Sequence, residues 1–288
     1  MNNKLLIFGC GYSAQFIAKR LITKGWKVFA TTRSQERFKK LKTLGISPIL
    51  WDDVFSVNNL LVEKCSLLSS IAPQDLIDDG LTAVSNLLKR ELIDINCLVY
   101  LSSTGVYGDR QGGWVSEDSD VNTVTDQGKA RVKAEKNWLN LASEYNIPLF
   151  VFRIAGIYGP DRSVFERINA RKAQKIIKPD QYFNRIHVDD LSGAVCAGLE
   201  NPKLAGIYNI ADDLPSSGAD VIDEATKLLQ KPNLPEVNFD DAKLSNMAKS
   251  FYLESKRVSN KKLKNSLRYC LKYPTYITGL RSLIKERF

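Results

Sequence analysis

The chain has very few of the residues that build metal sites and disulfides. His187 is the only histidine among 288 residues, and a single imidazole with no second histidine or cysteine nearby makes a poor metal site. We expect His187 to be a hydrogen-bonded structural residue between the lobes, although a role as a base stays open. The five cysteines lack Cys-x-x-Cys spacing and lie at Cys10, Cys65, Cys97, Cys196 and Cys270. This spacing predicts reduced, buried thiols and suggests neither a disulfide framework nor a zinc site.

Long apolar runs are also absent. No stretch approaches the roughly eighteen residues that a membrane span needs. The opening "MNNKLLIFGCGYSAQF" has too short an apolar run for a signal peptide, and a glycine-rich turn stands where a cleavage region would follow. With 44% hydrophobic and 25% charged residues, the composition is that of a compact protein. We therefore expect a soluble, cytoplasmic protein without a membrane partner.

The net charge of +9 is concentrated toward the end of the chain. After position 243, Lys and Arg residues alternate with Leu, Tyr and Val at helix-like spacing. A basic surface can attract nucleic acid or a phosphorylated ligand. No motif for reading a nucleic-acid groove accompanies this one, so a solvated helical face is the favoured interpretation. We expect no nucleic-acid partner.

Short apolar runs alternate with helix-like segments through the first half of the chain. The strand-like runs are "KLLIF", "WKVFATT", "SPILW", "SLLSSIA" and "CLVYLSS". The predicted helices cover 13–25, 34–45 (with Ser34 as its cap), 80–92 and 128–146. This alternation predicts an α/β fold with a doubly wound parallel sheet. The alternation is less regular after about residue 158, so we expect a Rossmann domain over 1–158 and a smaller, partly interleaved C-terminal substrate lobe over 159–288.

The turn "FGCGYSA" has the spacing Gly-x-Gly-x-x-Ala between the first strand and the first helix. Gly9 permits a tight turn, Gly11 lets the backbone approach a pyrophosphate, and Ala14 allows close helix packing. The free N–H groups at the start of the helix favour an anion. The predicted dinucleotide-binding residues of this turn are Gly9, Cys10, Gly11, Tyr12, Ser13 and Ala14.

The end of the second strand bears on the choice between NAD and NADP. An NAD site typically places Asp or Glu there, whereas this chain has Thr31, Thr32 and Arg33. Hydroxyl and guanidinium groups can bind a 2′-phosphate that a carboxylate would repel. We therefore expect Thr32 and Arg33 to bind NADP, with NAD less favoured. The alternative is that Arg33 is only a solvated loop charge.

Further motifs follow this turn in order, namely "YLSSTGVYGD" (100–109), "RIAGIYGP" (153–160) and "RIHVDDL" (185–191). With them, nearly the whole chain resembles the short-chain dehydrogenase/reductase superfamily. It is most similar to atypical members of the NAD-dependent epimerase/dehydratase (extended) branch. The resemblance places Asp52 where the family contacts the adenine edge, although Asp52 could instead cap a helix. Asp-Glu pairs typical of sugar-nucleotide dehydratases are replaced by Thr104 and Gly105, which argues against that activity.

The resemblance also implies a catalytic Ser at Ser103 and a Tyr-x-x-x-Lys pair on the next helix. In the family the Tyr is the acid/base, and the Lys holds the nicotinamide ribose and lowers the Tyr pKa. Here the Tyr position is Gln127 and the Lys position is Arg131. An amide cannot exchange a proton near neutral pH, so Gln127 is left as a candidate substrate-binding residue. Arg131 can still bind the cofactor's hydroxyl groups.

Three hypotheses about activity remain open. The protein could transfer a hydride with a proton from Tyr107 or from water, although Tyr107 could equally be a packing residue. It could bind NADP as a sensor without turnover. It could also use Ser103 with a residue of the C-terminal lobe in another oxidoreductase or isomerase reaction. Arg185 is the expected contact for a phosphate or carboxylate of a small-molecule substrate, unless Asp189 or Asp190 pairs with it.

The sequence does not identify the substrate, and a sugar-nucleotide-like compound stays open. The oligomeric state is open too, with a homodimer formed through helices that flank the sheet as one form.

Overall fold

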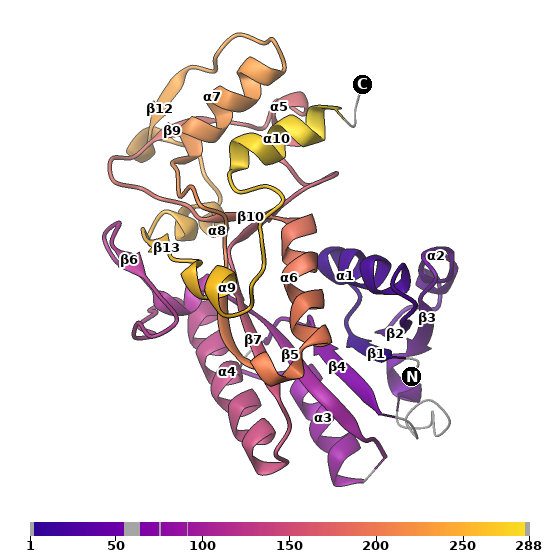
Figure 1. Cartoon of the computed structure of the whole chain (residues 1–288). Coiled ribbons are helices and arrows are strands. Elements are labelled where there is room, and N and C mark those ends of the chain that lie inside the picture. Colours follow the sequence, from indigo (N-terminus) through magenta and orange to yellow (C-terminus); the bar gives the residue numbers. More distant parts are fainter. Residues whose placement is uncertain (1–2, 55–63, 75, 91, 286–288) are drawn as a thin grey trace.

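A single parallel sheet forms the centre of the protein (Figure 1). The computed structural model describes residues 3–54, 64–74, 76–90 and 92–285. Seven strands pair in the order β11-β7-β5-β4-β1-β2-β3, and every pair is parallel. Their bounds are β1 (Lys4–Phe8), β2 (Lys27–Thr32), β3 (Ser47–Leu50), β4 (Cys65–Ser69), β5 (Ile95–Ser103), β7 (Leu149–Ile154) and β11 (Gly206–Ile210). The predicted doubly wound Rossmann-like fold is confirmed.

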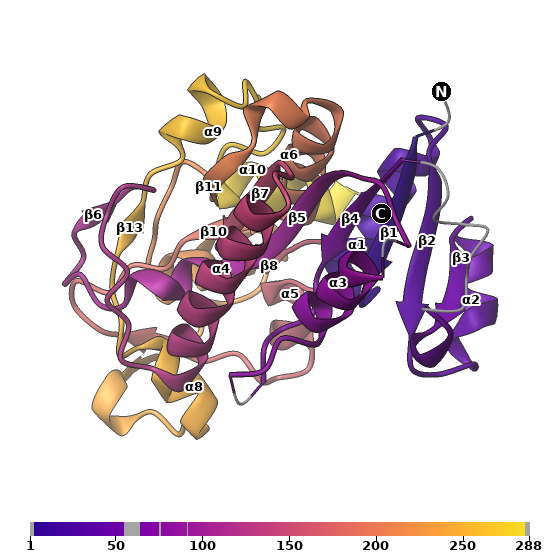
Figure 2. The ribbon, with the colours of Figure 1, turned by 90° about the horizontal axis from the view of Figure 1, so that it is seen from below.

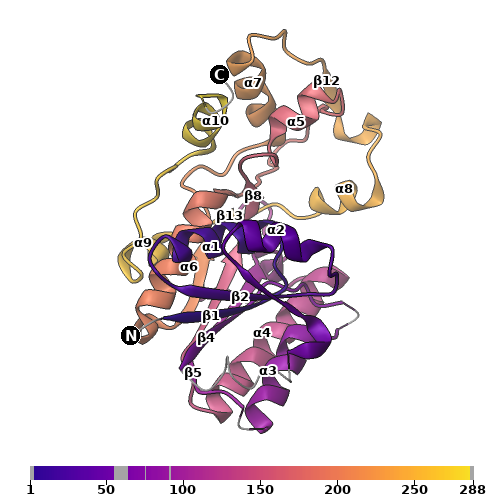
Figure 3. The ribbon, with the colours of Figure 1, turned by 90° about the vertical axis from the view of Figure 1, so that its right-hand side faces the viewer.

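Helices cover both faces of this sheet (Figure 3). One layer contains α1 (Tyr12–Ile22), α2 (Arg37–Thr43) and α6 (Val188–Glu200), and the other contains α3 (Asp79–Lys89) and α4 (Asp126–Glu144). Side chains of β1 alternate between them, with Leu5 and Ile7 in one core cluster and Leu6 and Phe8 in the other. Because all are buried, β1 reads as a continuous apolar run.

The start of α2 differs from its predicted position. The prediction placed Ser34 at the cap, but α2 begins at Arg37 and the amide of Ser34 donates a hydrogen bond to the Thr32 hydroxyl (3.2 Å). Ser34 is therefore held at the end of β2 and is not the cap. The predicted C-terminal end of α2 is close to the observed one. The helix ends at Thr43, and Gly45 lies just beyond it with φ +76°.

The C-terminal part of the chain is divided between the main sheet and a smaller lobe. After β7 the chain leaves the sheet, returns for α6 and β11, and leaves again, so residue 158 is not a simple boundary. The smaller elements are β6 (Trp114–Val115), β8 (Gly156–Tyr158), α5 (Val164–Asn169), β9 (Lys175–Ile177), β10 (Arg185–His187), α7 (Gly218–Leu228), β12 (Glu236–Asn238), α8 (Asn246–Phe251), β13 (Arg257–Val258), α9 (Lys261–Asn265) and α10 (Tyr276–Lys285). Four 3-10 helices are η1 (Trp51–Asp53), η2 (Thr104–Tyr107), η3 (Pro202–Leu204) and η4 (Phe239–Asp241).

The last third of the chain also reaches back to the Rossmann domain. Strand β13 pairs with β6, which lies in the connection between β5 and α4. Figure 2 shows this pair beside α4. The pairing brings residues near position 255 to the carboxyl end of β5, where a site is expected.

Among the residues that the structure describes, no helix is both long and apolar enough to cross a membrane.

Candidate functional site

The glycine turn forms a cradle for an anion at the start of α1. Gly9 has φ +78°, and a Cβ there would lie 2.8 Å from Cγ1 of Ile71, so only glycine fits. At Gly11 a Cβ would have no neighbour within 4 Å, which means that open space adjoins the helix start. No side chain caps α1, so its first N–H groups can bind an anion. This geometry fits the pyrophosphate of a dinucleotide.

The other turn residues support the cradle in different ways. Ala14 is fully buried, and Ser13 lies half-buried in the first turn of α1. The Tyr12 hydroxyl donates to the carbonyl oxygen of Pro160 (2.9 Å), so this side chain contacts the segment that leads into the smaller lobe. Burial raises the pKa of the Cys10 thiol to about 11, so the thiol stays neutral near neutral pH. These side chains position the turn, while its backbone faces the open space.

The end of β2 carries two guanidinium groups. Arg33 has a side chain that is 70% exposed, pairs with Asp79 (2.5 Å) and lies over the ring of Trp51 (5.6 Å). Arg37, from the first turn of α2, donates to the carbonyl oxygen of Cys10 (2.6 Å). The sequence reasoning missed Arg37, although its position four residues after Arg33 was a usable signal.

Thr32 and Asp52 are two further residues that the sequence predicts to bind the cofactor. The Thr32 hydroxyl is bonded to the backbone of Ser34, and its side chain is buried. Asp52 is exposed within η1. Leu50, and not Asp52, occupies the cap position of η1.

The two replaced positions on α4 behave differently. Gln127 is exposed in the first turn. Arg131 is half-buried, and its Nη1 donates to the Tyr100 hydroxyl (3.0 Å) and to the carbonyl oxygen of Leu101 (2.8 Å). These bonds hold the guanidinium at the carboxyl end of β5, which is close to where the family's lysine would act.

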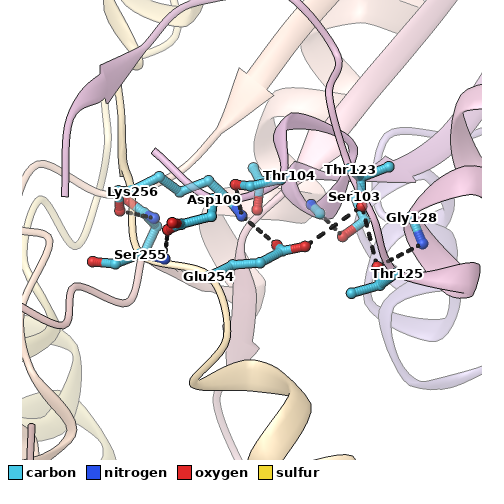
Figure 4. A network of polar contacts seen from close by, with 12 residues as sticks. Ser103, Thr104, Asp109, Thr123, Thr125, Gly128, Glu254, Ser255 and Lys256 are labelled. Atoms are coloured by element: carbon cyan, nitrogen blue, oxygen red, sulfur yellow. Dashed lines mark hydrogen bonds and ion pairs between the residues drawn. The ribbon is translucent and has the colours of Figure 1, made fainter. Parts of the chain in front are cut away.

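Ser103 ends β5 and faces the start of α4. Its Oγ accepts a hydrogen bond from the amide of Gly105 (3.1 Å). Figure 4 draws Ser103 together with Thr123, which contacts Glu254 of the C-terminal segment. Because the Ser103 side chain is only half-buried, its hydroxyl hydrogen is available to an incoming ligand.

Tyr107 lies in a buried network with no open side. Its hydroxyl donates to Oδ1 of Asn209 (2.7 Å) and accepts from Nη1 of Arg153 (3.0 Å). Arg153 in turn pairs with Glu135 (2.9 Å), and both side chains are only 6% exposed. Burial raises the pKa of the Tyr107 hydroxyl above its usual range. A fully buried hydroxyl with both bonding directions used does not fit the predicted proton donor, and the packing role fits instead.

Arg185 and His187 also have structural partners. Arg185 donates to the carbonyl oxygens of Phe183 (3.1 Å) and Ser217 (3.3 Å) and to the Ser216 hydroxyl (2.8 Å). The suggested partners bind elsewhere, because Asp189 pairs with Lys272 and Asp190 accepts from backbone amides of the C-terminal segment.

The His187 ring packs between Tyr158 (5.1 Å) and Tyr273 (4.2 Å), measured between ring centroids. Burial lowers the pKa of His187 to about 4, so the ring is neutral at neutral pH. The structural role fits this position. Across the described ranges, no group of three His, Cys, Asp or Glu side chains could hold a metal ion.

Three charged residues near Ser103 were missed by the sequence reasoning. Glu254 pairs with Lys256 (2.6 Å), and the Lys256 ammonium also donates to the carbonyl oxygen of Gly108 (2.8 Å). Asp109 accepts from the amide of Ser255 (2.7 Å). The contacts of Lys256 with Gly108 and of Asp109 with Ser255 join residues that are 148 and 146 positions apart, and such separations leave no local signal.

Comparison with known proteins identifies the family. A profile of the NAD dependent epimerase/dehydratase family matches residues 5–211. The chain belongs to this family. Protein YeeZ of Escherichia coli (strain K12) is 29% identical to the chain over 222 residues, which cover 72% of this chain and 77% of that protein.

Solved structures share the fold of this chain. A functionally unknown conserved protein from Silicibacter pomeroyi superposes with a TM-score of 0.90 at 37% identity, with 99% of each chain covered. UDP-N-acetylglucosamine 4-epimerase from Bacillus cereus has a TM-score of 0.77 at 15% identity, with 99% of each chain covered. Human epimerase family protein SDR39U1, solved with NADPH, has a TM-score of 0.74 at 16% identity over 98% of this chain and 99% of that one. At these low identities the last two show the shared fold alone.

Membership of the epimerase/dehydratase family indicates that the chain binds a nicotinamide dinucleotide. The cradle at Gly9 and Gly11 fits the phosphates of that cofactor. The family's catalytic tyrosine and lysine are replaced by Gln127 and Arg131, so membership alone does not supply a reaction.

Proposed function

We propose that the protein binds NADP and acts as an oxidoreductase or epimerase-like enzyme on a small-molecule substrate. The observation that carries the choice of NADP is the pair of guanidinium groups, Arg33 and Arg37, at the end of β2. A site for NAD typically presents a carboxylate from this position. Arg33 and Arg37 instead offer cationic donors to a 2′-phosphate.

The ion pair between Arg33 and Asp79 does not prevent this role. Both side chains are exposed, by 70% and 43%, and exposed pairs contribute only about 0–1 kcal/mol. A 2′-phosphate carries more charge than the Asp79 carboxylate and can replace it as the partner of Arg33.

The residues around β5 and α4 suit a redox site. Ser103 would donate its hydroxyl hydrogen to a substrate oxygen. Two of the five N–H donors of Arg131 are used by Tyr100 and Leu101, and the other donors would bind cofactor hydroxyls. Gln127 is exposed at the helix start and would contact the substrate. Bound NADP would supply the hydride donor or acceptor.

A regulatory role is the second candidate. Its support is that neither candidate position offers a tyrosine hydroxyl to a substrate. Position 127 is an amide, and the Tyr107 hydroxyl is buried and bonded to Asn209 and Arg153. In this case the protein would bind NADP(H) and report its concentration or redox state without turnover.

One pair of measurements tests the proposal. Fluorescence titration with NADPH and NADH would measure both dissociation constants, and we expect tighter binding of NADPH. Absorbance of NADPH in the presence of benzaldehyde, cyclohexanone or methylglyoxal would then detect turnover. Failure to bind either dinucleotide would contradict both candidates, whereas binding without turnover would favour the regulatory role.

A further inference from the structure

We propose that Glu254 is the proton-transfer residue of this site and that Lys256 holds its carboxylate in place. The inference rests on the proposed redox function. It answers which group exchanges the substrate proton when position 127 carries an amide and Tyr107 is closed off.

The segment that carries Glu254 is fixed on both sides. The Ser255 carbonyl oxygen accepts from the amides of Arg110 (2.9 Å) and Gly112 (3.0 Å). On the other side, the amide of Tyr182 donates to the Ser255 hydroxyl (3.0 Å), and the Glu254 carbonyl oxygen accepts from Nε2 of Gln181 (2.8 Å). A reacting group must be held by its surroundings, and these bonds leave Glu254 little freedom.

The two carboxylate oxygens of Glu254 have unequal partners. Oε2 is 2.6 Å from the Lys256 ammonium, whereas among the described residues Oε1 has only a long contact of 3.5 Å with the Thr123 hydroxyl. The side chains of Lys256 and Glu254 are 9% and 12% exposed. One oxygen therefore anchors the group, and the other keeps acceptor capacity. A hydroxyl bonded to a carboxylate makes a short and strong hydrogen bond.

Glu254 reaches the start of α4 through Thr123. Thr123 packs directly on Gly128, where a Cβ would lie only 2.0 Å from the Thr123 hydroxyl oxygen. The Thr123 hydroxyl then contacts both Thr125 (3.1 Å), which caps α4, and Glu254. Figure 4 shows this chain of contacts. Glu254 thus stands at the start of α4, the helix that carries the two replaced positions, Gln127 and Arg131.

The proposed step balances in protons and electrons. When bound, NADP⁺ would supply the acceptor for the hydride released as the substrate C–H bond breaks in alcohol oxidation, and NADPH would supply the hydride for carbonyl reduction. Glu254 Oε1 accepts the hydroxyl proton as the O–H bond breaks and the carbonyl double bond forms, and it later releases this proton to water. In carbonyl reduction the protonated Glu254 returns the proton to the oxygen. Lys256 keeps the carboxylate oriented and neutralises its charge, while Asp109 fixes the adjacent backbone.

The test compares Glu254→Gln with Glu254→Asp and a matched surface change. Glu200→Gln is the control, because Glu200 forms an ion pair with Lys24 at the protein surface. Each variant would be titrated with NADPH, unfolded in urea, and assayed with NADPH and benzaldehyde, cyclohexanone or methylglyoxal across a pH series. General acid–base groups contribute about 100-fold or more to kcat. We therefore expect Glu254→Gln to lose about 100-fold in kcat and its pH dependence, with NADPH affinity unchanged.

Glu254→Asp keeps the carboxylate and should recover part of the activity, which a purely structural role of the ion pair would not require. It also serves if Glu254→Gln fails to fold. A wild-type kcat and pH profile in Glu254→Gln would overturn this inference and leave the proposed function intact. Complete loss of activity in Glu254→Asp, as in an unfolded protein, would also overturn this inference. Tight NADPH binding without turnover of any probe would also overturn it. Absence of dinucleotide binding would instead refute the proposed function.

Discussion

Two polar networks meet the same helix, α4, but only one of them is closed. In the closed network, Glu135, Arg153, Tyr107 and Asn209 bond to one another within the core. In the open network, Glu254 binds Lys256 through one oxygen and leaves the other near Thr123. A group with all its bonds satisfied stabilises the fold, whereas a group with spare capacity can bind a ligand. Burial, rather than residue type, therefore separates Tyr107 from the proposed proton-transfer site.

The largest expected effect comes from opening the closed network. Glu135→Ala would leave the Arg153 guanidinium buried without its carboxylate partner, which typically costs about 3–5 kcal/mol. Urea unfolding would measure this loss in the free energy of unfolding. Glu200→Gln, which breaks the exposed pair with Lys24, should cost less than about 1 kcal/mol. Equal costs for the two variants would remove the distinction between buried and exposed pairs.

Asp212 at the end of β11 is an intermediate case. Its Oδ1 accepts from the amide of Leu214 (3.1 Å), whereas within the described residues its buried Oδ2 has no hydrogen-bond partner. Burial raises the pKa of Asp212 from 3.8 to about 7. Between these two values the folded state holds a proton that the unfolded state releases, so stability falls as pH rises through this window.

Asp212→Asn should remove that loss. Relative to wild type, the variant should gain on the order of a few kcal/mol at about pH 8 and little at about pH 4. Thermal unfolding across this range would measure the difference, and His187 contributes equally to both proteins. A difference that does not depend on pH would show that Asp212 does not titrate in this window.

A smaller effect is expected from the tyrosine itself. Tyr107→Phe removes the hydroxyl and leaves Oδ1 of Asn209 and one donor of Arg153 without their partner. Unsatisfied buried groups cost about 1–3 kcal/mol, so the variant should be less stable while its NADPH affinity and any turnover stay unchanged. Loss of turnover at unchanged stability would show that Tyr107 takes part in the reaction. The distinction between the closed and the open network would then fail.

The smallest expected effect concerns Arg33 and Arg37, the two guanidinium groups near the end of β2. Arg33→Ala should weaken NADPH binding by about tenfold, which equals about 1.4 kcal/mol, and leave NADH binding unchanged. Arg37→Ala should weaken both, because Arg37 also bonds to the Cys10 carbonyl oxygen of the turn. Titration of both dinucleotides would separate the two roles. Equal loss of NADPH and NADH in Arg33→Ala would argue against 2′-phosphate binding.

Local patterns were enough to predict part of this structure. The glycine turn, the alternation of strands and helices, and the position of Ser103 at the end of β5 all depend on neighbouring residues. The start of α2 was missed because the Thr32 hydroxyl takes the Ser34 amide. Glu254 and Thr123 are 131 residues apart, and the burial of Tyr107 depends on Arg153 and Asn209. Such contacts follow from the tertiary fold and leave no mark in a single sequence.

A crystal structure of the NADPH complex would test the central claim most directly. The account predicts the pyrophosphate at the start of α1 and the nicotinamide beside Ser103, on the side that Glu254 faces. It also predicts that Tyr107 stays bonded to Arg153 and Asn209. A nicotinamide ring placed against the Tyr107 hydroxyl, or a dinucleotide bound away from the turn at Gly9, would contradict the account.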